Sequence, residues 1–330
     1  MMMPTTMSHT RGGSPRWPTG YVVTDPVAWF DAERGTLLRV MRLAAQWGFD
    51  ELAWEPVLAA VPYYDHRSLF QDWRRSHRIA LAATRAAGNA RGQAALLQGV
   101  GQVHVYLDEH NEAQKALEES LRLYRGLGDQ RGEALALSGL ATVERVREHY
   151  DLMLRHGYAA LDLATRVDMR PMRAQLLGAI GLVRFETGGD PAGAALIEDG
   201  LRIARELGDR HRQAVILRHL SRYHQICHDY AAALRCLTVA LAILGEIDDE
   251  RCAAYTEQRI GGVYADLGDD VRARVALQRA AGVFRRIGDR QNEADCLEQL
   301  GELEHRDGTP HAARAHLDSA ERLREAIAMT

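Results

Sequence analysis

The chain has 330 residues, of which 46% are apolar and 26% charged, and its net charge is −4. This charge provides no clustered basic surface for nucleic acid or anionic lipid, so we expect neither direct nucleic-acid binding nor membrane binding. No apolar run is long enough for a signal peptide or a membrane span, and the four cysteines lack Cys-x-x-Cys spacing, which together favour a cytoplasmic protein without disulfides.

The N-terminal part of the chain is less regular than the rest. Residues 1–24 are rich in Pro, Thr, Gly and Arg, and we expect this segment to be disordered. The next stretch predicts a helix from Pro26 to about Gln46. Asp25 can cap the first turn of this helix, and proline suits its first position.

A divergent helical hairpin is predicted next, with helices over 51–62 and 68–87. All the tryptophans precede residue 74, and they are Trp17, Trp29, Trp47, Trp54 and Trp73. Such bulky rings can seal the end of a repeat array where no preceding unit covers it. We therefore assign residues 25–90 to an N-terminal cap helix followed by a Trp-rich hairpin.

Turn positions then recur with a fixed period of forty residues. The series is Gly48, Gly88, Gly128, Asp168, Gly208, Asp248 and Gly288. In the clearest copies an apolar residue precedes a glycine, which can adopt the left-handed conformation that ends a helix, and an aspartate follows that can cap the next one. A period of this size is typical of a solenoid, in which each unit buries its apolar face against its neighbours.

The register of the repeats can be followed at two matched positions. A small residue recurs on the first helix of each unit, at Gly101, Ala141, Gly181, Ser221, Gly261 and Gly301. The corresponding position of the second helix holds Leu117, Gly157, Ile197, Leu237, Leu277 and Leu317. Small residues let two helices approach closely, and the larger apolar ones fill the space between them. The pattern predicts paired helices throughout residues 91–330, as six regular repeats.

This pattern resembles the tetratricopeptide repeat (TPR), most completely in Ile260-Gly261-x-x-Tyr264 followed by Ala273-x-x-x-Leu277. The resemblance covers roughly residues 51–327. It implies an all-α, TPR-like, right-handed solenoid of helical hairpins, with a period of forty residues instead of the usual ~34.

A second resemblance involves the segments before the regular repeats. They include Ala28-Trp29-Phe30-Asp31-Ala32-Glu33-Arg34, Tyr63-Tyr64-Asp65-His66-Arg67 and Asp72-Trp73. These segments look like the C-terminal TPR region of actinobacterial AfsR-like regulators, the Streptomyces antibiotic regulatory proteins (SARP), and of related STAND ATPases. The resemblance implies a sensor or protein-interaction arm. ATP hydrolysis is not expected, because the only lysine, Lys115, lies outside any P-loop pattern.

The TPR resemblance also implies that the first helix of each unit lines a concave groove. Its middle then holds Arg145, Gln175, Arg218, Arg222 and Gln225, and its C-terminal end holds Asp266, Asp295, Glu298 and Glu302. We expect these basic and amide residues to bind an extended peptide or protein tail. An acidic group of that ligand should lie near Arg218 and Arg222, because paired guanidinium groups suit carboxylates.

The sequence indicates no active site, metal site or cofactor. It contains no Gly-x-Ser-x-Gly, His-Glu-x-x-His or Gly-x-Gly-x-x-Gly motif. His224, Cys227 and His228, with Asp229, form the densest group of metal-type ligands, and the two histidines share a helix face, but ordinary packing explains them better than a metal site does.

The sequence therefore favours a non-catalytic regulatory scaffold that binds a peptide or protein partner in its groove. A small-molecule or signalling-peptide receptor and an enzyme of a biosynthetic cluster remain as alternatives. The last helix, over 311–327, carries Leu317, Leu323 and Ile327 on a face that no further unit covers. This face could serve as a homodimer contact.

Overall fold

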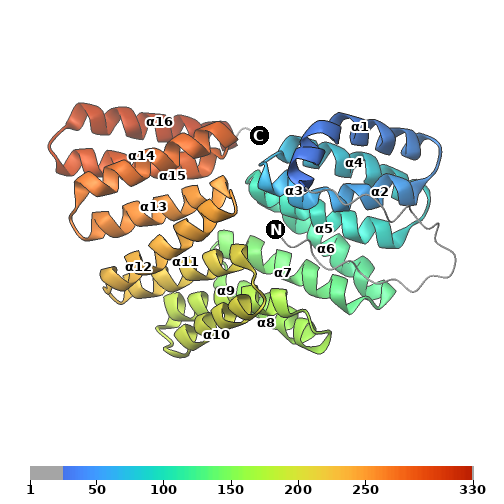
Figure 1. Ribbon diagram of the computed structural model, residues 1–330, viewed down its shortest axis with the longest axis horizontal. Coiled ribbons are helices and arrows are strands. Elements are labelled where there is room, and N and C mark those ends of the chain that lie inside the picture. Colours follow the sequence, from blue (N-terminus) through green and yellow to red (C-terminus); the bar gives the residue numbers. More distant parts are fainter. Residues whose placement is uncertain (1–24, 329–330) are drawn as a thin grey trace.

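The computed structural model describes residues 25–328, and this part of the chain consists of sixteen helices without a strand. Figure 1 shows them as a curved stack: α1–α7 form an N-terminal arm, α8–α10 lie at the bend, and α11–α16 form a C-terminal arm. This arrangement confirms the all-α, TPR-like fold. Residues 1–24, for which we expect disorder, lie outside the described part.

The first four helices precede the regular hairpins. They are α1 (Pro26–Gln46), α2 (Asp50–Ala59), α3 (Val61–His66) and α4 (Phe70–Ala86). The Asp25 side chain accepts a hydrogen bond from the backbone N–H of Ala28, which confirms the predicted cap of α1. The helix predicted over 51–62 is instead divided near Ala60, because Pro62 has no N–H to continue the hydrogen-bond ladder.

Six hairpins follow, each made of two consecutive helices. Their helices are α5 (Ala90–Tyr106) and α6 (His110–Leu127); α7 (Gln130–Val146) and α8 (Tyr150–Arg166); α9 (Arg170–Gly188) and α10 (Ala192–Glu206); α11 (Arg210–Ile226) and α12 (Tyr230–Glu246); α13 (Glu250–Asp266) and α14 (Asp270–Ile287); α15 (Arg290–Arg306) and α16 (Pro310–Ala328). Most of these helices have 17 residues, and three-residue turns between them account for the period of forty.

The predicted turns adopt the predicted conformation. All seven residues of the forty-residue series have positive φ, including Asp168 at 52° and Asp248 at 55°. A second series of left-handed residues ends the first helix of each hairpin. It comprises Ser68, Asp108, Glu148, Gly189, His228, Gly268 and Gly308. Sequence analysis missed this series, because Ser, Glu and His at such positions give no recognisable turn signal.

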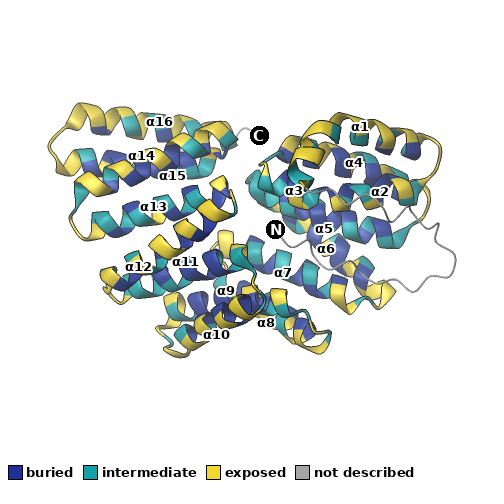
Figure 2. Cartoon of the chain, viewed as in Figure 1, coloured by how far each residue is buried: buried dark blue, intermediate teal, exposed yellow. Residues whose placement is uncertain are grey.

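Helix contacts within the hairpins follow the predicted register. A Cβ atom added to Gly101 would lie 2.4 Å from Cγ of Leu117, and one added to Gly261 would lie 2.6 Å from Cγ of Leu277. The small position of the first helix therefore faces the large apolar position of the second. Buried residues gather where neighbouring helices touch, while exposed residues lie on the outer faces (Figure 2).

In the cap region only some of the tryptophans are buried as the sequence predicts. Trp54 and Trp73 are buried, as expected of rings that close the end of a solenoid, but Trp29 and Trp47 are 41% and 71% exposed. Trp17 lies outside the described residues. That residues 25–90 act as a cap stays a prediction.

At the other end, Leu317 of α16 is 42% exposed, whereas Leu323 packs against the core formed by α13–α15. Ile327 is partly buried. The predicted homodimer contact stays a prediction. Within residues 25–328, none of the helices has the length and apolarity that crossing a bilayer requires.

Candidate functional site

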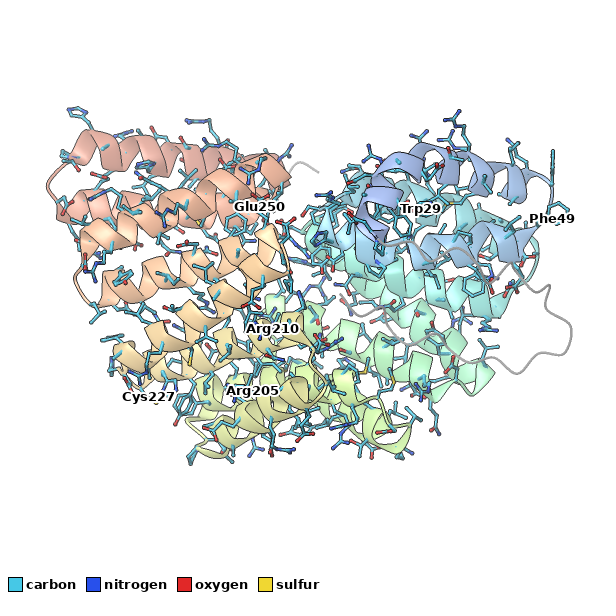
Figure 3. All side chains as sticks on the ribbon, in the orientation of Figure 1. Trp29, Phe49, Arg205, Arg210, Cys227 and Glu250 are labelled. Carbon is cyan, nitrogen blue, oxygen red and sulfur yellow. The ribbon has the colours of Figure 1, made fainter. Side chains whose placement is uncertain are left out.

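The two arms of the stack meet at a contact that we call the seam. Arg251, at the start of α13, forms an ion pair with Asp65 of α3, 186 residues earlier. The Arg251 guanidinium also lies 4.3 Å from the ring centroid of Tyr106 and 5.6 Å from that of Phe70. Side chains of both arms meet beside Glu250 (Figure 3). The concave side is therefore a hollow closed by the seam, not the open groove that the sequence suggests.

Two cavities adjoin the seam. One of about 330 Å³ is lined by Gln98, Gln102 and Tyr106 of α5, together with Gln175 of α9 and Arg212 of α11. The other, of about 480 Å³, lies between the α3–α4 turn and the α12–α13 turn. The amide side chains of the first cavity can both donate and accept hydrogen bonds, as the backbone of an extended peptide requires.

Three arginines from different first helices lie close enough to His219 to act on its charge. They are Arg145 of α7, Arg218 of α11 and Arg259 of α13. Burial lowers the pKa of the neighbouring His219 to about 3, and the positive charges of all three arginines contribute to this shift. Arg259 is exposed, yet the loss of hydration among the surrounding protein atoms and then the charges of Arg222 and Arg218 lower its pKa to about 10. These positive charges repel one another.

Arg222 and Gln225, two of the predicted site residues, have partners within the protein. Arg222 Nε donates to Oε1 of Glu186 at 2.9 Å, and Gln225 Nε2 donates to Oδ2 of Asp266 at 2.6 Å. The structure therefore separates Arg222, which pairs with a carboxylate, from Arg218, which lies over the Tyr255 ring. Whether the five predicted residues bind a ligand stays a prediction.

Sequence analysis missed Arg259. Its column in the repeats reads Gly99, Gly139, Ala179, His219, Arg259 and Gln299. The column changes from small residues to large polar ones in the C-terminal half. That change in residue size was the available signal.

Acidic side chains face each other across the seam near the basic cluster. Asp108, in the α5–α6 turn, has its pKa raised to about 7 by burial and by the charges of Asp289 and Asp295 on the other arm. The Tyr255 hydroxyl donates to Asp289 at 2.8 Å, while the Arg218 guanidinium lies 5.4 Å from the Tyr255 ring. Tyr255 thus lies between the basic cluster and these carboxylates.

The predicted acidic end of the groove is partly neutralised. Arg324 of α16 donates to Oε2 of Glu298 at 2.6 Å and to Oδ1 of Asp295 at 3.3 Å. The sequence pattern could not show this pairing, because it joins the inner face of α15 to the second helix of the same hairpin.

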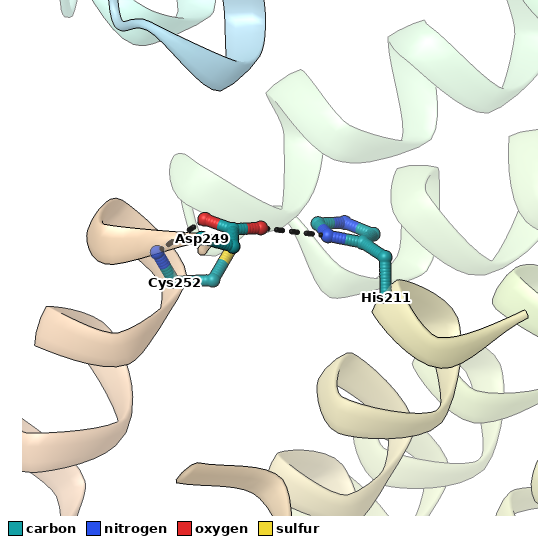
Figure 4. Close-up of side chains that lie close together, drawn as sticks. All are labelled: His211, Asp249 and Cys252. Carbon is teal, nitrogen blue, oxygen red and sulfur yellow. Dashed lines mark hydrogen bonds and ion pairs between the residues drawn. The ribbon is translucent and has the colours of Figure 1, made fainter. Parts of the chain in front are cut away.

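His211, Asp249 and Cys252 form a compact group with metal-ligand chemistry, shown in Figure 4. Asp249 caps α13 by accepting from the backbone N–H of Cys252 at 3.0 Å, and it accepts from Nδ1 of His211 at 2.9 Å. Burial raises the pKa of the Cys252 thiol to about 12, and the positive Arg251 lies nearby. Helix capping and a His–Asp hydrogen bond account for this group, and a nearby guanidinium disfavours a metal cation.

The histidine group identified in the sequence is arranged differently from the group of His211, Asp249 and Cys252. Helix α11 ends at Ile226, and Nδ1 of His228 is 2.9 Å from the hydroxyl of Tyr230. Among residues 25–328, the His224, Cys227 and His228 side chains do not form a cluster with metal-ligand spacing.

No protein-family model matches the sequence, and no curated protein matches it significantly. Solved structures do match. NprR in complex with its cognate peptide NprX has a TM-score of 0.65 at 13% identity, over 90% of this chain and 89% of that one. A Rap protein complexed with competence and sporulation factor has a TM-score of 0.59 at 13% identity, over 90% and 99%.

A third match is a STAND protein with a tetratricopeptide repeat sensor from Pyrococcus horikoshii, with a TM-score of 0.59 at 15% identity. The match covers 84% of this chain but only 42% of that one. At these identities the comparisons establish the TPR-like fold. They do not extend to the AfsR-like regulators that the sequence resembles.

Proposed function

We propose that this protein is a non-catalytic regulatory scaffold that binds a peptide, or an extended segment of a protein partner, in the hollow between its arms. One observation carries the proposal: basic and amide side chains of α5, α7, α9, α11 and α13 converge on the concave side, where an extended chain would be surrounded by donors. The neighbouring folds named with bound NprX and with competence and sporulation factor support a peptide as ligand.

The regulatory part of the proposal rests on the resemblance to AfsR-like regulators and on the TPR sensor of the STAND protein. In this view the chain supplies the sensing arm of a control system for transcription or secondary metabolism. The cytoplasmic setting expected from the sequence belongs to the same proposal, and all four cysteines are free thiols, as a reducing compartment requires.

The non-catalytic part rests on the chemistry of the hollow. The best-placed nucleophile, Cys252, is buried, and its raised pKa keeps it a thiol at neutral pH. A receptor for a signalling peptide is a special case of the proposed function.

The proposal is tested by selecting peptides from a random library on the purified protein and measuring their affinity by calorimetry. Gln175→Trp places a bulky ring in the wall of the hollow, and we expect it to weaken binding about tenfold or more. The matched control is Val239→Trp, at an exposed position of the outer helix α12. Equal affinity of wild type and both variants would place the ligand elsewhere and reject the proposal.

A further inference from the structure

Helix α1, at the outer edge of the N-terminal arm, is apolar on two sides (Figure 1). Its inner side packs on α2 and α4, and Met41 and Ala44 are buried there. Its outer side carries a row of exposed, uncharged residues at helical spacings of seven, four, three and four. This row, which we call the outer stripe, comprises Trp29, Thr36, Val40, Leu43 and, as the C-cap, Trp47. A helix that is apolar on both sides is typical of one buried between two neighbours, yet within residues 25–328 nothing covers the outer stripe.

The outer stripe exposes a large apolar area. The exposed fractions are 41% for Trp29, 41% for Val40, 47% for Leu43 and 71% for Trp47, and Phe49 in the following turn adds 57%. Trp29 and Phe49 lie at opposite ends of this surface (Figure 3). Since an aromatic side chain has roughly 150–250 Å² of surface, these fractions amount to roughly 500 Å². An apolar patch of this size is near the upper limit for a monomeric protein and is typical of an interaction site.

Contacts with α3 hold α1 in place beneath this surface. Phe30 stacks on Tyr63 with the ring centroids 5.0 Å apart, and the Tyr63 hydroxyl donates to Oδ1 of Asp31 at 2.7 Å. Arg67 forms an ion pair with the same carboxylate. A partner therefore meets a preformed helix and loses little free energy in ordering it.

The outer stripe is nearly symmetric along the helix. Trp29 and Trp47 lie at equal distances in sequence from Leu38, and so do Thr36 and Val40. When two copies of α1 run antiparallel about this midpoint, Trp29 of one copy lies opposite Trp47 of the other, and Thr36 lies opposite Val40. The interface of a two-fold symmetric dimer requires a surface that is complementary to itself in this way. Since the outer stripe has no charged residue, two copies do not repel each other through it.

We propose that the outer stripe is the interface of a homodimer in which α1 of one copy packs antiparallel against α1 of a second copy. Together the two copies bury roughly 1,000 Å² of apolar surface, which is about the minimum for a specific interface. The small Thr36 lets the two helices approach closely, and the tryptophans cover both ends of the contact.

This interface is not the one expected from the sequence, which assigned the homodimer contact to α16. Within residues 310–327, Leu317 is the only exposed large apolar side chain, so α16 offers a smaller apolar area than α1. The proposed dimer does not depend on the proposed function, because peptide binding is assigned to the hollow and not to α1.

The test measures the mass of the full chain in solution by sedimentation equilibrium over a dilution series. We expect twice the mass of a single chain, with dissociation on dilution. Val40→Lys places an unpaired charge in the interface twice, by symmetry, and should weaken the dimer about 100-fold or more. Thr36→Glu should act in the same way. The matched control is Val275→Lys on α14, because Val275 is 44% exposed and belongs to another helix, and this variant should stay dimeric.

A mixture of the two interface variants tests the antiparallel register. In a mixed dimer the carboxylate introduced by Thr36→Glu in one copy lies opposite the ammonium group introduced by Val40→Lys in the other. An equimolar mixture should therefore form dimers at a concentration at which each variant alone is monomeric. Circular dichroism checks that each variant folds, and the exposure of both positions means that the substitutions do not disturb the core.

A wild-type chain that stays monomeric at every concentration overturns the proposal and assigns the outer stripe to another occupant, either residues 1–24 or a different protein. A dimer that persists in both interface variants, or that dissociates in Val275→Lys or Leu317→Lys, uses another face and also rejects it. A mixture that stays monomeric rejects the antiparallel pairing. Dimers of the wild type, the control and the mixture, with monomers of each interface variant alone, support it.

Discussion

The interfaces between neighbouring repeats differ in composition from the seam between the arms: the former are apolar, and the latter contains charged and aromatic side chains. Neighbouring hairpins share continuous apolar clusters, such as the one that runs from Ala94 through Leu117 to Val183. The seam has one ion pair, Asp65–Arg251, with two aromatic rings beside it and a group of mutually repelling carboxylates.

Because of this difference, the repeat interfaces determine the stability of the stack, whereas the seam determines how far apart the two arms lie. Apolar burial at about 25 cal/mol per Å² holds each repeat to the next. A single ion pair whose carboxylate is about a third exposed contributes little net free energy. We expect the repeats to behave as rigid units, and we expect the seam to open and close at small cost. The hollow can then admit a ligand without unfolding any repeat.

The largest loss of stability is expected from a substitution inside an arm. Leu117 is 1% exposed and fills the space beside Gly101 and Gly139. Leu117→Ala should lower the free energy of unfolding by about 3 kcal/mol through lost burial and the cavity left behind. Leu127→Ala, at a 47% exposed position of the same helix, is the control and should cost under about 0.5 kcal/mol. Similar Tm values for the two variants would contradict the packing described for α5–α7.

A smaller change in stability but a larger change in shape is expected at the seam. Asp65→Asn leaves the Arg251 charge without its anion, so Arg251 should move to solvent and separate the arms. We expect a larger radius of gyration by small-angle scattering and a loss of about 1–2 kcal/mol. Asp162→Asn breaks an exposed pair with Arg166 within α8 and should change neither quantity. An unchanged scattering curve for Asp65→Asn would show that other contacts hold the arms together.

The next effect concerns the turns that set the period. Gly128 ends α6 at φ 66°, and a Cβ atom there would contact nothing within 4 Å, so the cost of Gly128→Ala is purely conformational. We expect a loss of about 1 kcal/mol. Gly126→Ala lies two residues earlier in the helix, also with open space, and should instead gain about 0.5–1 kcal/mol. Chemical denaturation of both variants decides whether their signs differ.

These regions also differ in how far the sequence predicts them. Gly128 and Asp129 form a local signal, so the helix ends and the register of Gly101 against Leu117 follow from the sequence alone. The contact between the arms at the seam does not follow from the sequence alone. It depends on the sum of the small rotations between consecutive hairpins from α3 to α13. Arg145 and Arg218 were assigned to the concave side by analogy with other repeats. The Glu186–Arg222 pair joins neighbouring hairpins and the Glu298–Arg324 pair joins the two helices of one hairpin, and the repeat pattern predicts neither pair.

The smallest change in the free energy of unfolding is expected at the acidic side of the seam, and this change depends on pH. Asp108 has a pKa near 7 in the folded protein instead of 3.8, through burial and the charges of Asp289 and Asp295. Between about pH 4 and 7 the folded chain therefore retains a proton that the unfolded chain has lost, so this group makes stability fall as pH rises through that window. Asp289 accepts a hydrogen bond from the Tyr255 hydroxyl, and Asp295 accepts one from the Arg324 guanidinium.

Asp108→Asn removes this titration and keeps the left-handed turn, which asparagine tolerates. Because the seam can open to relieve the repulsion, we expect a gain under about 1 kcal/mol at pH 8 and a smaller one at pH 5.5. The variant should also stay compact at pH 8, where wild type expands in scattering. Asp168→Asn is the control, since Asp168 occupies an equivalent left-handed turn but is exposed. If both variants shift Tm equally at the two pH values, the turn itself and not the contact across the seam is responsible.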